Sequence, residues 1–543
     1  MMPAGFRKLL LFCAVLLIVS LLPGEENQPN FAEIRPRALV RDELTVVFSR
    51  GRVELDFRKS YMASEAQLFT AIYEGLFSHH PRTMQPVPAL AESWVLSEDR
   101  RQWTFTIREN ARFWNGDPVT AEDFRASWLS LISPERNSPY SSSFDIIVGA
   151  RDFRNGLEKN PDNVGIIAAG PRTLIVRLNS PAAFFPAMLC HHSFAPIHPS
   201  MIDKEDWSPG GSDWTPPMSN GPFRISAMDE NRMILLRNEY YWDAGQVSLN
   251  KITIIFAETG EAAANLWNSG QAHWIAGNVN FEALTDRSGI HVNPMFATHY
   301  YFIRSAQEPW NDYRIRRALV LALPWEEIRR GHFIPARTLV FPIFGYPDIE
   351  GLYRTDLDES LRLLTEAGFS GGYGLPELVI RITPSQEAAR IAGIMASTWN
   401  GQLGVPVRVE VIPFEYYLQS LTEDNYGVGS STWIGDFADP LSFLKMWRNN
   451  SNLNNARLND PDFEDLMERS MFEEGEARFE LLAQAEQLLL DRGTVLPISH
   501  VPAVNVVDLN ELAGWYPNIL NIHPFKYISF RAFRPLPGVV LGK

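Results

Sequence analysis

Two aspartates lie three residues apart in the segment WIGDFADP, at residues 433–440. Asp439 directly precedes Pro440 and an apolar run, a pattern typical of a helix N-cap with proline in the first turn. Asp436 has no local role of this kind. A carboxylate that a fold encloses needs a positively charged partner, so Asp436 is the stronger candidate for binding a cationic group. The alternative is a solvated aspartate in a turn.

Histidines form a second group of residues with metal-binding chemistry. They occur as two adjacent pairs, His79 with His80 and His191 with His192, and His198 follows closely. Adjacent side chains point apart on a regular helix or strand, so neither pair is expected to hold one metal ion. We therefore expect no metal and no cofactor.

The usual catalytic motifs are not found in the sequence. It contains no H-E-x-x-H, no G-x-S-x-G and no nucleophile signature around Cys190. The acidic pair Glu122 and Asp123 follows Thr120, which fits a capping box and a first helical turn whose carboxylates complement the helix dipole. We expect no enzymatic activity, and a secreted hydrolase is the alternative from another functional class.

Length and composition indicate a folded protein of more than one domain. The chain has 543 residues, enough for about two to four domains of ordinary size. Hydrophobic residues make up 45% and charged residues 21%, the balance of a globular protein. The formal net charge of −15 repels phosphate backbones and anionic lipid, so nucleic acid is not expected as a partner.

The N-terminus has the pattern of an export signal. Arg7 and Lys8 precede an apolar stretch at residues 9–22, which is shorter than the roughly 20 residues that a membrane helix needs. We expect residues 1–26 to be a signal peptide, with an uncleaved N-terminal anchor as the alternative. Bulky Phe12 precedes Cys13, and half the apolar run follows that cysteine, so lipid attachment there is not expected.

Short β-branched runs alternate with amphipathic segments along the chain, which predicts an α/β fold. Strands are expected at residues 45–49, 103–108, 173–178, 233–237, 251–256, 378–383 and 407–412. Helices are expected at residues 314–323, 357–367, 386–403 and 477–491, and Ser64 with Gln67 suggests a further capping box. Loops rich in glycine, proline and small polar residues are expected at residues 208–222 and 370–374.

Several ordered blocks resemble a known family. They are YEGLF at residues 73–77, LAESW at 90–94, NGDPVTAEDF at 115–124, SNGPF at 219–223, RNEYYW at 237–242, IRRAL within 314–323 and WIGDFADPLSFL at 433–444. Together they are similar to the family 5 extracellular solute-binding proteins of peptide importers, the oligopeptide- and dipeptide-binding group. The resemblance covers nearly the whole chain.

The resemblance implies a two-lobed periplasmic-binding-protein type II fold with three domains. Domain I is expected to be discontinuous, at residues 40–77, 204–300 and 504–543. Domain II is expected at residues 78–203 and domain III at residues 301–503. Between the lobes, the resemblance implies an enclosed cleft for the ligand.

The resemblance also implies a function and a site. The chain is expected to capture short peptides, to hand them to ABC permease subunits in the inner membrane, and to act as a monomer in the periplasm or on the outer face of the cytoplasmic membrane. Asp436 matches the carboxylate that binds the peptide's α-amino group. The implied ligand-binding residues are Asp436, Trp433, Gly429, Ser430, Ser431, Thr432, Ile434, Tyr61, Met62 and Ala63.

Other ligands remain open on the same scaffold. The alternatives are a sugar, to which the 15 tryptophans offer stacking surfaces, a metal chelate, haem and a signalling peptide. Some relatives carry a cysteine where this chain has Ile434. The sequence does not specify ligand length or the identity of the permease.

Overall fold

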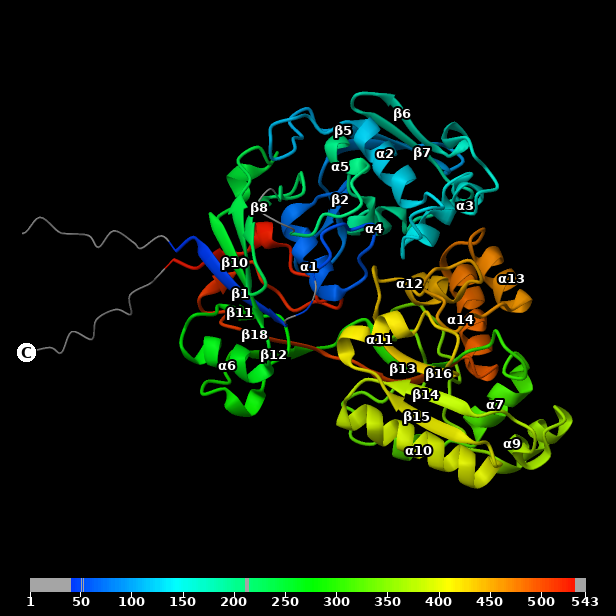
Figure 1. The fold of residues 1–543 in the computed structure, drawn as a ribbon. Helices are drawn as coiled ribbons and strands as arrows, with labels where there is room; N and C mark the ends of the chain where they lie inside the picture. Colours follow the sequence, from blue (N-terminus) through cyan, green and yellow to red (C-terminus); the bar gives the residue numbers. More distant parts are fainter. Residues whose placement is uncertain (1–40, 50, 52, 210–213, 533–543) are drawn as a thin grey trace, which may run out of the picture. The chain divides into compact units, whose positions relative to one another are not determined.

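The computed structural model describes residues 41–49, 51, 53–209 and 214–532. Its largest sheet has seven strands in the order β12-β18-β11-β1-β10-β9-β8 (Figure 1). These strands are β1 (Glu43–Ser49), β8 (Phe223–Met228), β9 (Arg232–Arg237), β10 (Lys251–Ala257), β11 (Trp274–Ile275), β12 (Ile290–Asn293) and β18 (Ala503–Val507). Blue, green and red segments of the chain therefore lie in one sheet.

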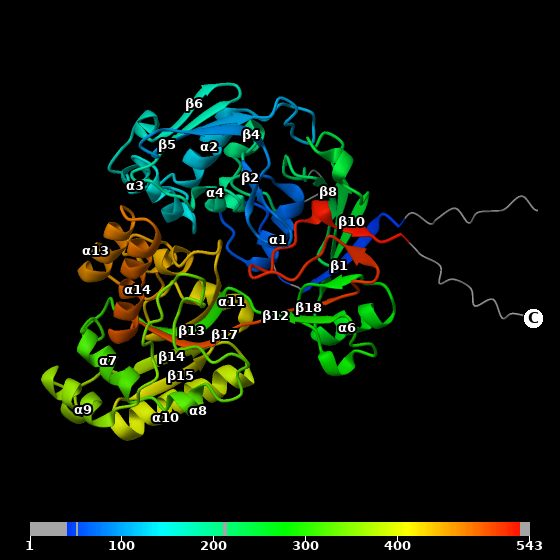
Figure 2. The ribbon, with the colours of Figure 1, turned by 180° about the vertical axis from the view of Figure 1, so that it is seen from behind.

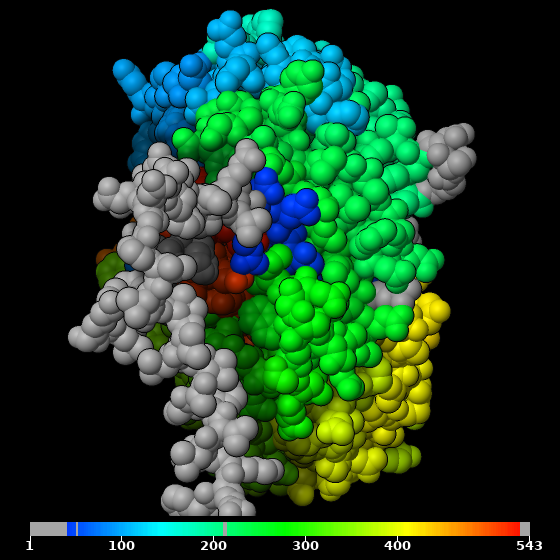
Figure 3. Space-filling model, turned by 90° about the vertical axis from the view of Figure 1, so that its left-hand side faces the viewer, coloured from blue at the N-terminus to red at the C-terminus, as the bar shows by residue number. Residues whose placement is uncertain are grey.

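Strand β1 lies inside this sheet and pairs in parallel with both β10 and β11. Its residues Val46, Val47 and Phe48 are buried, as expected for a strand that has a neighbour on each side and is covered on both faces. Figure 3 shows one face of the protein, on which blue residues near the start of the described chain lie directly beside green residues.

A second sheet has five strands in the order β15-β14-β16-β13-β17. They are β13 (Ala297–Ile303), β14 (Leu378–Ile382), β15 (Val407–Val411), β16 (Val428–Ile434) and β17 (Val495–His500). Helix α10 (Gln386–Leu403) packs along β14 and β15 in both ribbon views (Figures 1 and 2). Its buried residues Ile391, Met395, Trp399 and Leu403 recur every four positions, the spacing of one apolar helix face.

A third sheet has four strands in the order β4-β5-β7-β6. They are β4 (Ala91–Leu96), β5 (Gln102–Ile107), β6 (Ile166–Gly170) and β7 (Thr173–Arg177), and helix α2 (Ala121–Leu131) packs on β6 and β7. The predicted capping box of Thr120 and Asp123 is confirmed, since both reciprocal hydrogen bonds are present. Phe124, Trp128 and Leu131 are buried on one face of α2, as predicted.

The remaining helices and short strands connect these sheets. They are α1 (Ala63–Ile72), α3 (Ala150–Arg154), α4 (Phe185–Met188), α5 (Pro199–Ile202), α6 (Gly260–Asn268), α7 (Tyr313–Leu321), α8 (Trp325–Ile328), α9 (Leu357–Glu366), α11 (Phe414–Ser420), α12 (Leu441–Leu444), α13 (Pro461–Ser470), α14 (Gly475–Asp491), β2 (Phe77–His79), β3 (Pro86–Pro88), β19 (Leu512–Ala513) and β20 (Ser529–Phe530). All seven predicted strands and all four predicted helices are confirmed, with ends that differ by at most two residues.

The capping box predicted for Ser64 and Gln67 is wrong. Helix α1 begins two residues earlier, with Met62 and not Ser64 at the N-cap, and no side chain of the described residues caps it. The Gln67 amide instead donates to the carbonyl of His523 at 2.8 Å and accepts from its N–H at 2.8 Å. A long-range backbone partner has replaced the local cap, which a single segment of sequence cannot reveal.

The predicted N-terminal segment and one of the two predicted loops lie wholly or partly outside the described residues. Residues 1–26 and part of the 208–222 loop lie outside the described residues, whereas residues 370–372 form a 3₁₀ turn. In the described part of the chain, no helix is long and apolar enough to cross a membrane. The bounds of the three domains stay a prediction.

Candidate ligand-binding cavity

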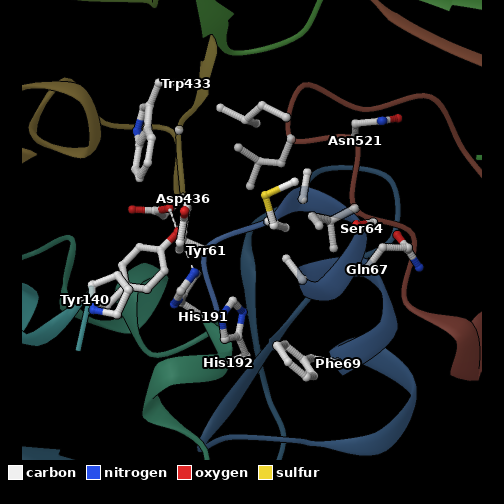
Figure 4. Close-up of a pocket in the computed structure, with 18 of the residues that line it drawn as sticks. Tyr61, Ser64, Gln67, Phe69, Tyr140, His191, His192, Trp433, Asp436 and Asn521 are labelled. Atoms are coloured by element: carbon white, nitrogen blue, oxygen red, sulfur yellow. Dashed lines mark hydrogen bonds and ion pairs between the residues drawn. The ribbon is translucent and has the colours of Figure 1, made fainter. Parts of the chain in front are cut away.

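A cavity of about 710 Å³ is lined by most of the residues that the sequence predicts for the site (Figure 4). Its walls come from the start of α1, from strands β13 and β16, from the turns at residues 137–140 and 190–195, and from loops at 452–455 and 520–524. A volume of this size is typical of a site for a small organic ligand.

Nine of the ten predicted site residues line this cavity. They are Tyr61, Met62, Ala63, Ser430, Ser431, Thr432, Trp433, Ile434 and Asp436. Gly429 is the exception, because this position faces away from the cavity. A Cβ atom added there would lie 2.6 Å from the Phe302 ring and 3.0 Å from the Leu421 side chain. Their shared position is a structural fact, while their contact with a ligand stays a prediction.

Strand β16 has one edge that no other described strand continues. It pairs antiparallel with β13 along its whole length, but β14 meets it only at Val428. The backbone N–H and C=O of Ser430 bond to the Tyr417 hydroxyl at 2.9 and 3.0 Å, so these groups point away from β13. Backbone direction alternates along a strand, so Thr432 and Ile434 also direct their N–H and C=O groups toward this edge.

Asp436 lines the cavity, with its side chain only 6% exposed. Lys445 places its Nζ 2.7 Å from Asp436 Oδ2. This contact is an ion pair without the angle of a hydrogen bond, since Oδ2 has no hydrogen-bond partner in the described part of the chain. Tyr140 donates its hydroxyl to Oδ1 at 3.3 Å, and His191 Nε2 lies 3.8 Å from the same oxygen. Figure 4 shows Asp436, Tyr140 and His191 together on one wall.

Lys445 is the residue that sequence reasoning missed. It follows α12 in a 3₁₀ turn (Lys445–Trp447), is 10% exposed, and also donates to Ser143 Oγ at 3.1 Å. The only signal was a charged residue inside an otherwise apolar run, nine positions after Asp436. A charge in such a run is expected to have a buried partner.

The expectation that His191 and His192 point apart is wrong. Their ring centroids lie 3.9 Å from each other, because His191 caps a 3₁₀ turn (His192–Phe194) with an extended backbone and belongs to no regular element. Burial holds the pKa of both histidines well below its ordinary value, and the charge of Lys445 lowers that of His191 further. Among the described residues, no group of three or more His, Cys, Asp or Glu side chains could hold a metal ion.

Asp439 has the capping role that the sequence predicts, and a second role that it does not reveal. Its Oδ1 accepts from the N–H of Leu441 at 2.9 Å, although α12 begins only after Pro440. Both carboxylate oxygens also accept from the guanidinium of Arg478 in α14, each at 2.8 Å. Asp439 is therefore a structural residue outside the cavity.

Residues 85–455 match the family model for the middle region of the bacterial extracellular solute-binding proteins, family 5. The chain belongs to this family. The oligopeptide-binding protein OppA of Bacillus subtilis is 29% identical over 448 residues, which cover 78% of this chain and 82% of that protein. The periplasmic oligopeptide-binding protein OppA of Salmonella typhimurium is 29% identical over 494 residues, which cover 86% and 89%.

Solved structures agree with the assignment to family 5. The murein tripeptide binding protein MppA of Escherichia coli has a TM-score of 0.78 and 25% identity, with 90% of this chain and 98% of that one covered. An oligopeptide-binding protein of Borrelia burgdorferi has a TM-score of 0.78 at 24% identity, with 90% and 100% covered. The predicted α/β fold of the type II binding proteins is confirmed.

Glu74 is a second carboxylate on the cavity wall of this family 5 protein. It belongs to the block YEGLF, and its partners come from the block RNEYYW and from the C-terminal part of the chain. Tyr241 donates to Oε1 at 2.8 Å, Trp242 Nε1 donates to Oε2 at 2.6 Å, and Lys526 Nζ lies 2.5 Å from Oε1. This network joins two blocks by which the family is recognised.

Trp433 forms part of the wall and not a free stacking surface. Its side chain is buried, and its Nε1 donates to the carbonyl of Ser442 at 2.9 Å. Its ring centroid lies 6.4 Å from that of Tyr140. The indole is therefore fixed in place by α12, with one part of its surface facing the cavity.

Proposed function

We propose that this family 5 protein captures short peptides in the 710 Å³ cavity and delivers them to the permease of an ABC importer. The observation that supports this most is the edge of β16 that carries Thr432 and Ile434 and that β14 does not continue. A peptide lying along this edge would extend the sheet by one strand.

Strand addition suits a receptor for peptides of varied sequence. Main-chain hydrogen bonds satisfy the N–H and C=O groups that all peptides share, while side chains enter pockets that tolerate differences. Tyr61, Met62 and Ala63, at the start of α1, line the same cavity and are proposed to contact the ligand from another side. Asp436 is proposed to face the amino-terminal end of the peptide.

Names of the relatives support a peptide as the ligand. Both OppA relatives are oligopeptide-binding proteins, and the Escherichia coli neighbour binds a murein tripeptide. For this chain we propose export, action as a monomer in the periplasm or on the outer face of the cytoplasmic membrane, and binding without catalysis.

The test is calorimetric titration of the purified protein with a set of di- to pentapeptides, followed by mass spectrometry of the peptide released on denaturation. We expect saturable binding with micromolar or tighter Kd and release of the intact peptide. Recovery of fragments would show a hydrolase, and saturation only by an oligosaccharide or a metal chelate would replace the peptide as the ligand class.

A further inference from the structure

The carboxylate proposed to face the ligand's amino end already has a cationic partner from its own chain. Lys445 Nζ lies 2.7 Å from Asp436 Oδ2, and both side chains are almost fully buried, at 10% and 6% exposed. Lys445 also lies 5.7 Å from the ring centroid of Tyr140 and 5.4 Å from that of Phe437. These aromatic faces and Ser143 hold the ammonium behind Asp436.

Lys445 does not itself line the large cavity. It borders a small void of about 10 Å³ on the far side of Asp436, together with Ser143, His191 and Phe437. A ligand that enters the large cavity therefore meets the carboxylate and not the lysine. Displacing Lys445 would leave a buried ammonium with one hydroxyl partner, which is strongly unfavourable.

Among the described residues, the cavity wall offers no other charge that a ligand ammonium could use. Glu74 is the other carboxylate on its wall, and Lys526, Tyr241 and Trp242 already occupy the oxygens of Glu74. No lysine or arginine occurs among the lining residues that the structure describes. Each negative charge facing the cavity is thus balanced by a lysine behind it.

Histidines do not change this balance at neutral pH. His79, His191, His192 and His299 line the cavity. Burial lowers the pKa of His79 and His299 to about 4, and that of the other two well below the ordinary value. All four side chains are therefore neutral imidazoles near pH 7.

We propose that the end of the ligand facing Asp436 is uncharged, as in an N-acylated peptide, and that a free α-amine is not required. This inference rests on the proposed peptide-binding function and narrows its substrate class. An added ammonium would give the Asp436–Lys445 pair a net positive charge in an enclosed site. An amide N–H suits the pair better, because it brings no charge and can donate to Asp436 Oδ1. Among the described residues, this oxygen accepts one hydrogen bond, from the Tyr140 hydroxyl at 3.3 Å.

The test compares one tetrapeptide in two forms, with a free amino terminus and with an N-acetyl group, by calorimetry on the full-length protein at pH 7.5. The wild type is expected to bind the acetylated form at least as tightly as the free amine. A preference of tenfold or more for the free amine would overturn the inference and leave the peptide-binding function standing. Failure of both forms to bind would overturn both.

Two variants make the test specific to the ion pair. Lys445→Met leaves the Asp436 carboxylate without its cation, so the preference is expected to shift at least tenfold toward the free amine. In Lys445→Met combined with Asp436→Asn, which removes both charges, that shift is expected to disappear. A Lys445→Met protein that is folded, by its circular dichroism, and that keeps the wild-type preference would contradict the inference.

Discussion

The two aspartates of one short loop have different positions although they lie three residues apart. Asp439 is bound by both arms of the Arg478 guanidinium and caps α12 outside the cavity. Asp436 lines the cavity and contacts Lys445 through one oxygen, without hydrogen-bond geometry. Two carboxylates that are both buried and paired thus have different positions: one fixes the loop, and the other presents an oxygen to the cavity.

The largest expected effect on stability comes from breaking the ion pair between Asp439 and Arg478. Arg478→Met leaves the Asp439 carboxylate buried without its cation, which should lower the free energy of unfolding by about 3–5 kcal/mol. Urea denaturation monitored by fluorescence measures this loss. Arg478→Lys, which keeps the charge but not the two-armed geometry, is the matched control and should lose less. Equal losses in both variants would contradict this account, because they would show that a charge without the bidentate geometry does not stabilise Asp439.

Acidification should destabilise the region around Asp436 through its histidines. The folded-state pKa of His191 and of His192 is lowered by burial, so the stability that depends on their neutral form is present above about pH 6.5 and is lost as the pH falls. The expected loss is about 1.4 kcal/mol per histidine for each pH unit below 6.5. Thermal unfolding between pH 7.5 and 5 measures it.

Replacement of both histidines by glutamine is the control for that measurement. The double variant should show a smaller fall in Tm on acidification than the wild type. An unchanged dependence on pH would mean that other groups, among them the buried His523, whose pKa is lowered to about 3, account for the acid sensitivity.

A smaller effect on stability is expected at Lys445. Lys445→Met removes the cation beside Asp436, but that carboxylate faces the cavity and can be hydrated from it, so we expect a loss of about 1–3 kcal/mol. Urea denaturation in the absence of peptide measures the change in the free energy of unfolding. If Lys445→Met lowered the free energy of unfolding as much as Arg478→Met does, Asp436 would be as fully enclosed as Asp439. That result would contradict the different positions of the two aspartates.

The fold could be predicted well because its signals are local. Apolar periodicity located helix α10 to the residue, and the Thr120–Asp123 box located the start of α2. Family resemblance located nine of the residues that line the cavity, all but Gly429 of those it implied. Prediction failed where a partner comes from elsewhere in the chain: Gln67 bonds to His523, and Asp439 pairs with Arg478.

For the same reason, the sequence predicted the carboxylate of the candidate site but not the cation that is paired with it. The sequence pointed to Asp436 because that residue has no local role, yet a carboxylate's counter-ion depends on the tertiary fold. Lys445 is close in sequence, but only the turn after α12 directs its ammonium to the far side of Asp436. The close approach of His191 and His192 likewise depends on an extended cap that no periodic pattern encodes.

Binding of a peptide along the exposed edge of β16 is tested most directly at Thr432. Thr432→Pro removes an N–H directed to that edge while leaving the hydrogen bonds between β13 and β16 intact, because proline is tolerated at a strand edge. Calorimetry should show peptide affinity at least tenfold weaker than in Thr432→Ala, which keeps the N–H, with similar Tm for both variants. Equal affinity in the two variants would contradict strand addition as the mode of binding.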